Sequence, residues 1–115
     1  MQTLRVLTTL LLVSSASLPQ TNSQVFTGEI MDSPCAAMGN HNRMMRGVEA
    51  KDAKECSRKC VPLMGKYVLY DKVKNTSYQL DDQQKSAAYA GQKVSVKGTY
   101  DAGSKTIHTE SITSQ

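Results

Sequence analysis

Three cysteines and one histidine are the residues of this sequence with the strongest potential for chemistry. Cys35 and His41 lie in the segment DSPCAAMGNH, and Cys56 and Cys60 lie in the segment ECSRKC. Two residues four apart on a helix share one face, with Cβ atoms about 5–6 Å apart. That gap is wide for a disulfide, which needs about 3.8 Å, but it suits a metal ion bound about 2.3 Å from each sulfur. We therefore predict one metal site formed by Cys35, His41, Cys56 and Cys60, a Cys3His set of the kind found in structural zinc sites.

The methionines bear on the identity of the metal. Five of the six methionines lie between residues 31 and 64, around the cysteines. Thioether and thiolate sulfurs favour Cu(I), whereas cysteine combined with histidine suits Zn(II). Methionine also fills irregular gaps in apolar cores without any ligand role. The sequence thus predicts Zn or Cu as the cofactor and leaves the choice between them open.

A disulfide is the competing interpretation of the same cysteines. A bond from Cys35 to Cys56 or Cys60 would close a loop of about twenty to twenty-five residues. The chain-entropy model predicts that such a bond stabilises the fold by roughly 3 kcal/mol. Because the chain has three cysteines, one thiol would remain, and a redox role for that thiol is a third interpretation. Spacing alone leaves all three interpretations open.

The elements that must position these residues are predicted from periodicity and turn residues. Residues 25–33 form a strand by their β-branched and aromatic content, and Gly28 indicates a bulge or bend within it. Val48–Cys60 is predicted as a helix, because its alanines and cysteines recur at helical spacing. Pro62 is expected to end this helix, since the residue before a proline is disfavoured in the helical region.

The C-terminal half is predicted as strands with one short helix. KYVLYD and TSYQL form a hairpin, and KVSVKGTY and TIHTESI form another. Between the hairpins, Asp81 or Asp82 caps a short helix and Gly91 ends it in the left-handed conformation. Gly98 allows the fourth strand to coil sharply.

These elements predict a mainly β fold: a small OB-like Greek-key β-barrel of about five strands with one Cys-bearing helix insertion, α+β overall. A small β-sandwich is the alternative architecture. The predicted core consists of Ile30, Leu69, Val94, Val96, Ile107 and Ile112.

The N-terminus is typical of a secretory signal peptide. A single positive charge at Arg5 precedes the apolar run VLTTLLLV, and SSAS follows with small residues, so cleavage is expected after Ser17 or Ser23. The apolar run is shorter than the roughly 20 residues that span a bilayer. We therefore predict a signal peptide over residues 1–23 and a single OB-like domain over residues 24–115. The protein is expected to be exported to the periplasm or extracellular space, with no stable membrane insertion after cleavage.

Charge and the remaining motifs restrict the function classes. The net charge is +4, and basic residues alternate with acids in VEAKDAKECSRK, whereas nucleic-acid binding requires a concentrated basic face. We therefore predict no nucleic-acid partner. The sequence has no Ser-His-Asp signature, phosphate loop or cofactor motif, so no catalytic residue is predicted and the chain is not expected to be an enzyme. His108 is expected on a strand face, and the strand tyrosines are expected mainly to pack.

Five segments together resemble a family of small exported bacterial proteins of unassigned function: FTGEIMDSPC, ECSRKC, GKYVLYD, YQLDD and AGQKVSVKGTYDAGSKTIHTESI. That family shares a D-S-x-C start, a histidine soon after, a C-x3-C helix and a V-x-G-T-Y-D-like hairpin. The resemblance covers nearly all of residues 25–112 and implies an OB-like fold, an exported location and a bacterial source. It implies no established activity. It marks Asp32, Cys35, His41, Cys56 and Cys60 as the site.

The expected function is accordingly that of an exported small binding module that holds a soft metal ion, Zn or Cu, at the Cys/His segment. The alternative is a disulfide-stabilised structural or interaction domain of the cell envelope with no chemistry of its own. The sequence indicates no particular protein partner.

Overall fold

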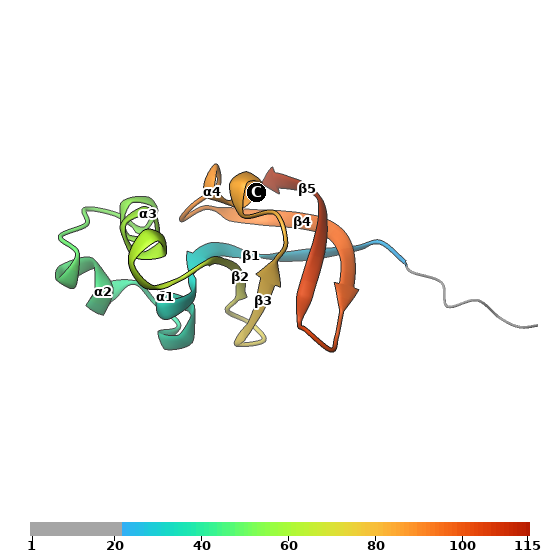
Figure 1. Ribbon diagram of the computed structural model, residues 1–115, viewed down its shortest axis with the longest axis horizontal. Coiled ribbons are helices and arrows are strands. Elements are labelled where there is room, and N and C mark those ends of the chain that lie inside the picture. The colour runs from blue at the N-terminus through green and yellow to red at the C-terminus, as the bar shows by residue number, and fades with distance from the viewer. Residues whose placement is uncertain (1–21) are drawn as a thin grey trace, which may run out of the picture.

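The computed structural model describes residues 22–115 and is shown in Figure 1. Its elements, in chain order, are β1 (Gln24–Asp32), α1 (Ser33–Met38), α2 (Asn42–Gly47), α3 (Ala53–Met64), β2 (Tyr67–Asp71), β3 (Thr76–Leu80), α4 (Gln83–Ala87), β4 (Lys93–Asp101) and β5 (Thr106–Ser114). The predicted signal peptide lies, except for its last two residues, outside the described part of the chain. No helix within residues 22–115 is both long and apolar enough to span a membrane.

The five strands close into a ring in the order β1-β2-β3-β5-β4, with β4 pairing back to β1. All neighbouring pairs are antiparallel except β3 and β5, which are parallel. The fold is mixed α+β with more strand than helix, in agreement with the coarse prediction of a β-rich barrel. Three helices, rather than the one predicted, connect β1 to β2, and Figure 1 shows them gathered beyond one end of the strands.

Two glycines allow β1 and β4 to take part in this closed ring. Gly28 pairs with Val94 in an uninterrupted register. Of the bulge or bend predicted at this glycine, the bulge is therefore absent from the pairing of β1 with β4. A Cβ at Gly28 would instead collide with the backbone carbonyl of Tyr70 on β2. Gly98 lies at a register shift between β4 and β5, and a Cβ there would collide with the His108 carbonyl. The predicted distortion of the fourth strand therefore lies at Gly98.

The predicted core is confirmed. All six predicted residues belong to one buried cluster inside the ring: Ile30, Leu69, Val94, Val96, Ile107 and Ile112. Three aromatic rings pack against one another at the edge of this cluster, with centroids separated by 5.2 Å for Phe26–Tyr78 and 5.6 Å for Tyr78–Tyr100. These two tyrosines therefore pack, as expected from the sequence. A second buried cluster lies between the strands and α1 and α3, and it contains all three cysteines.

The cysteine-bearing helix differs from its prediction at both ends. It begins at Ala53 rather than Val48, because the Asp52 side chain accepts a hydrogen bond from the Glu55 N–H at 2.8 Å and so forms the N-cap. Upstream, Glu49 has a left-handed φ of 55°, which breaks helical continuity. Pro62 lies inside the helix instead of ending it, and the helix runs on to Met64. Proline removes one N–H donor and crowds the carbonyl four residues earlier, so Pro62 weakens the last turn without ending the helix.

The short helix before the second hairpin is capped as predicted. The Asp82 side chain accepts a hydrogen bond from the Lys85 N–H at 2.8 Å. Gly91 has the predicted left-handed conformation, with φ of 75°, but the helix itself ends at Ala87 and is capped by Ala88 in a right-handed conformation. Gly91 therefore ends the turn after α4 and not the helix.

Candidate metal centre

The junction of β1 and α1 places the first two residues of the site. Asp32 is the last residue of β1 and also the N-cap of α1, where its Oδ2 accepts a hydrogen bond from the Cys35 N–H at 3.0 Å. Proline in the first turn of α1 suits this start, because its missing N–H has no partner to lose there. The D-S-P-C sequence thus fixes Cys35 within one helical turn of a carboxylate. Both side chains are fully buried.

A pair of hydrogen bonds fastens α3 to the same junction. The Ser57 Oγ donates to Asp32 Oδ1 at 3.1 Å, and the Asp32 backbone N–H donates to Ser57 Oγ at 3.3 Å. The neighbouring Cys56 consequently faces Cys35, with 3.9 Å between the two Sγ atoms. Cys56 and Cys60 are both fully buried. The three cysteines of the described residues are free thiols.

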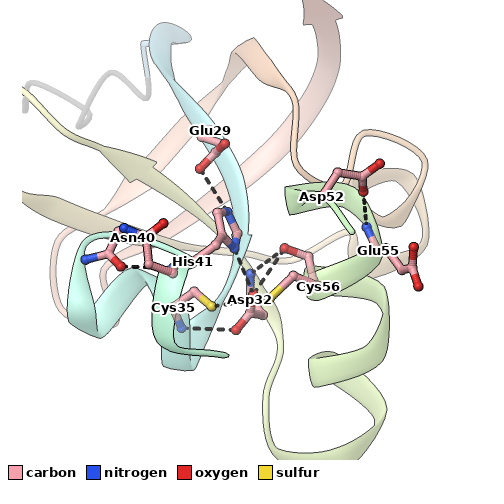
Figure 2. A network of polar contacts seen from close by, with 10 residues as sticks. Glu29, Asp32, Cys35, Asn40, His41, Asp52, Glu55 and Cys56 are labelled. Atoms are coloured by element: carbon pink, nitrogen blue, oxygen red, sulfur yellow. Dashed lines mark hydrogen bonds and ion pairs between the residues drawn. The ribbon is translucent and has the colours of Figure 1, made fainter. Parts of the chain in front are cut away.

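His41, directly before α2, completes the group. Its Nε2 lies 3.2 Å from Glu29 Oε2, and its Nδ1 lies 3.8 Å from Asp32 Oδ1. Figure 2 shows the imidazole ring held between these two carboxylates. The Glu29 carboxylate favours a proton on Nε2, which leaves the lone pair of the neutral ring on Nδ1. Among residues 22–115, Nδ1 of His41 is the buried side-chain nitrogen or oxygen that has no hydrogen-bond partner.

Four donor atoms therefore converge. One ligand atom from each of Asp32, Cys35, His41 and Cys56 lies within 4.8 Å of the other three, and all four residues are buried. This group is positioned to hold a metal ion. It differs from the set predicted by spacing in one member, because it contains Asp32 and does not contain Cys60.

The pKa values of the thiols show how strongly this site disfavours uncompensated negative charge. Burial, followed by the hydrogen bond and the charge of Asp32, raises the pKa of Cys35 far above its ordinary value. Burial also raises the pKa of Cys56, and burial together with the charge of Asp32 raises the pKa of Cys60 to about 11. The thiols are therefore protonated at neutral pH, and a bound cation would supply the positive charge that their deprotonation requires.

A cavity of about 570 Å³ opens beside His41. Its lining includes Glu29, Asn40, Asn42 and Tyr70. The Glu29 side chain is 27% exposed whereas that of His41 is 9% exposed, so the site meets solvent through the Glu29–His41 pair. Of the four grouped residues, His41 is the one that lines this cavity.

The methionines singled out by the sequence divide into two groups. Met31 is buried in the cysteine-containing cluster, and Met44 and Met45 pack against it. Met38 and Met64 are exposed by 38% and 54%. Of the methionines within residues 22–115, Met31, Met44 and Met45 therefore lie in or against the cluster that contains the cysteines.

The other candidates from the sequence have structural partners. His108 is exposed and its Nδ1 lies 3.3 Å from Asp81 Oδ2. Asp81 also accepts a hydrogen bond from the Thr109 N–H at 2.8 Å, which joins the loop after β3 to β5. No protein-family model, curated protein or solved structure matches this chain.

Proposed function

We propose that this chain is an exported metal-binding module that holds one Zn(II) or copper ion at Asp32, Cys35, His41 and Cys56. The observation that carries the proposal is the buried Nδ1 of His41, which has no hydrogen-bond partner and lies beside Asp32. Burying a polar nitrogen without a partner costs free energy. A metal ion among these donors would remove that cost, and the Glu29 carboxylate behind the ring would orient it, as carboxylates do for many metal-bound histidines.

The separation of the two sulfurs supports the same conclusion. Two thiolates bound to Zn(II) at about 2.3 Å in a tetrahedral site lie about 3.8 Å apart. The Sγ atoms of Cys35 and Cys56 lie 3.9 Å apart. Little movement of either side chain would therefore be needed for both to bind one ion. Cysteine, histidine and aspartate are all established zinc ligands.

Export and an OB-like barrel are parts of this proposal. The N-terminal sequence supports export. The intact mass of protein recovered from the periplasm or medium tests this, and the mass is expected to correspond to cleavage after Ser17 or Ser23. The ring order of the strands, with α4 between β3 and β4 in sequence, supports an OB-like architecture. The chain is proposed to bind its ion without catalytic activity of its own.

Metal retention by the reduced full-length chain tests the proposal. After loading with Zn(II) and desalting, elemental analysis is expected to give about one equivalent for the wild type and much less for His41→Ala and Asp32→Asn. Asparagine is as good an N-cap as aspartate, so Asp32→Asn removes the charge and keeps the helix start. His108→Ala is the matched control, because it removes the exposed histidine. Wild-type protein that retains no metal would contradict the proposal.

A disulfide between Cys35 and Cys56 is the second candidate, and their 3.9 Å separation is the observation that favours this pair over Cys35–Cys60. It would make the chain a disulfide-stabilised structural or interaction domain of the envelope. The two candidates exclude each other, because a metal needs both sulfurs as thiolates. Thiol labelling of denatured exported protein distinguishes them: three labelled cysteines support the metal site, and one supports the disulfide.

A further inference from the structure

Cys60 is a buried thiol that the four-residue group does not use. It follows Cys56 by one turn of α3, and both thiols are fully buried. It belongs to the same buried cluster as Cys35 and Cys56. Free cysteine is often buried for packing alone, so a ligand role for Cys60 depends on its position beside the two other thiols.

The three thiols belong to a cluster of apolar residues that lies beside the buried Asp32 carboxylate. Met31 lies in their cluster, and Met44 and Met45 pack against it. Val68 and Tyr70 of β2 are also buried in this cluster. Thiolate and thioether sulfurs are soft ligands that suit Cu(I). The oxygen and nitrogen donors Asp32 and His41 instead favour a divalent ion.

The distance between two of the three sulfurs suits a set of three sulfurs around one ion. Three thiolates in a plane at about 2.3 Å from a metal lie about 4.0 Å from one another, close to the 3.9 Å between the Sγ atoms of Cys35 and Cys56. Cβ atoms four residues apart on a helix are about 5–6 Å apart, which lets the sulfurs of Cys56 and Cys60 approach to that distance. Asp32 can remain outside this set, because it already accepts hydrogen bonds from Ser57 Oγ and the Cys35 N–H.

We propose that Cys35, Cys56 and Cys60 form a second ligand set that binds Cu(I) and shares two thiols with the Asp32–His41 set. The inference rests on the proposed function, since it assigns a second ion to the same centre. Because Cys35 and Cys56 belong to both sets, the centre holds one ion at a time and Cu(I) displaces Zn(II). Cys60 is then the residue that determines the preference for Cu(I), and His41 is the residue that determines the preference for Zn(II).

Competition titrations on the reduced full-length chain under anaerobic conditions test this assignment. A chromophoric Cu(I) chelator reports Cu(I) affinity, and a chromophoric Zn(II) chelator reports Zn(II) affinity. Cys60→Ser is expected to weaken Cu(I) binding by at least about tenfold and to leave Zn(II) binding nearly unchanged, whereas His41→Ala is expected to do the reverse. Cys35→Ser is expected to weaken both. Cys60→Ala is a second variant in case the serine hydroxyl disturbs the buried cluster.

A measurement on the wild type avoids dependence on the folding of variants. X-ray absorption of the Cu(I)-loaded protein is expected to show three sulfur neighbours and no nitrogen. Unchanged Cu(I) affinity in Cys60→Ser and Cys60→Ala, or a nitrogen neighbour, would overturn this inference and leave the proposed function standing. Wild-type protein that binds Cu(I) with three sulfur neighbours and does not bind Zn(II) would overturn the four-residue set alone. Wild-type protein that binds neither ion would overturn both.

Discussion

Ser57 and Asp32, 25 residues apart in sequence, exchange two hydrogen bonds: the Ser57 Oγ donates to the Asp32 carboxylate, and the Asp32 backbone N–H donates to Ser57 Oγ. Both residues are fully buried. Ser57→Ala would leave the Asp32 N–H and one carboxylate oxygen without these partners. We expect it to lower the free energy of unfolding by about 1–3 kcal/mol, measured by urea denaturation of the metal-free protein. Ser111→Ala, at an exposed position, is the control and is expected to change stability by less than about 0.5 kcal/mol.

Glu29 is expected to tune the metal affinity through His41. Removing the carboxylate in Glu29→Ala leaves the His41 ring free to rotate and change tautomer, and a loss of this kind typically weakens metal binding by about 10–100-fold. Glu29→Gln is expected to recover part of the affinity, because its amide oxygen can still accept a hydrogen bond from the His41 Nε2–H. Zn(II) competition titrations measure both. Glu110→Ala removes an exposed carboxylate and is the control. An equal loss of Zn(II) affinity in this variant would show that overall charge, and not orientation of the His41 ring, causes the loss.

The raised thiol pKa values predict an alkaline limit to the stability of the reduced, metal-free protein. Burial raises the pKa of Cys60 from 9.0 to about 11. Below pH 9 the Cys60 thiol is protonated in both the folded and the unfolded chain, so its ionisation does not lower the free energy of unfolding. Between pH 9 and about 11 the unfolded thiol ionises first, and stability falls with rising pH. Urea midpoints across this range are expected to fall less steeply in Cys60→Ser, and an equally steep fall in that variant would contradict the assignment.

Metal binding is expected to show the opposite dependence on pH. The thiols are protonated in the metal-free protein, so each bound thiolate releases a proton, and Zn(II) affinity should increase as pH rises. Calorimetry of Zn(II) binding in two buffers with different ionisation enthalpies measures the number of protons released. A value of zero near pH 7 would contradict binding through Cys35 and Cys56.

The core prediction allows a matched pair of valine variants. Val96 is fully buried inside the ring and Val73 is 98% exposed. Val96→Ala is expected to lower the free energy of unfolding by about 1–3 kcal/mol, through lost burial and the cavity left behind. Val73→Ala is expected to change it by less than about 0.5 kcal/mol. Chemical denaturation of the two variants under identical conditions checks both values.

The parts that sequence reasoning predicted well depend on local pattern. Alternation of Val94 and Val96 with polar neighbours places both in the core, and Asp82 before a short polar segment marks a helix start. The start of α3 was placed wrongly because the apolar spacing extends back to Val48, whereas the Asp52 cap and the left-handed Glu49 decide the boundary. At such positions the capping residue and the apolar periodicity favour different helix starts. The spacing of the alanines does not show which of the two sets the boundary.

Asp32 shows why the candidate site could be predicted only in part. Its position before Ser-Pro indicates the end of a strand and a cap, which it provides. Its burial depends on Ser57, 25 residues away, and no spacing rule connects the two. The family resemblance includes Asp32 in the site, whereas the spacing of cysteine and histidine does not indicate it. Cys60 was included because it shares a helical face with Cys56, and that face also serves packing.

The closeness in sequence of the proposed ligands has a consequence for the order in which the molecule assembles. Asp32, Cys35, His41, Cys56 and Cys60 all precede β2, whereas closure of the ring requires β1 to pair with β4 at Lys93–Gly98. Local contacts form with a smaller loss of chain entropy than distant ones. All proposed ligands therefore precede β4 in the chain, and the proposed metal site can assemble from local contacts before the ring closes.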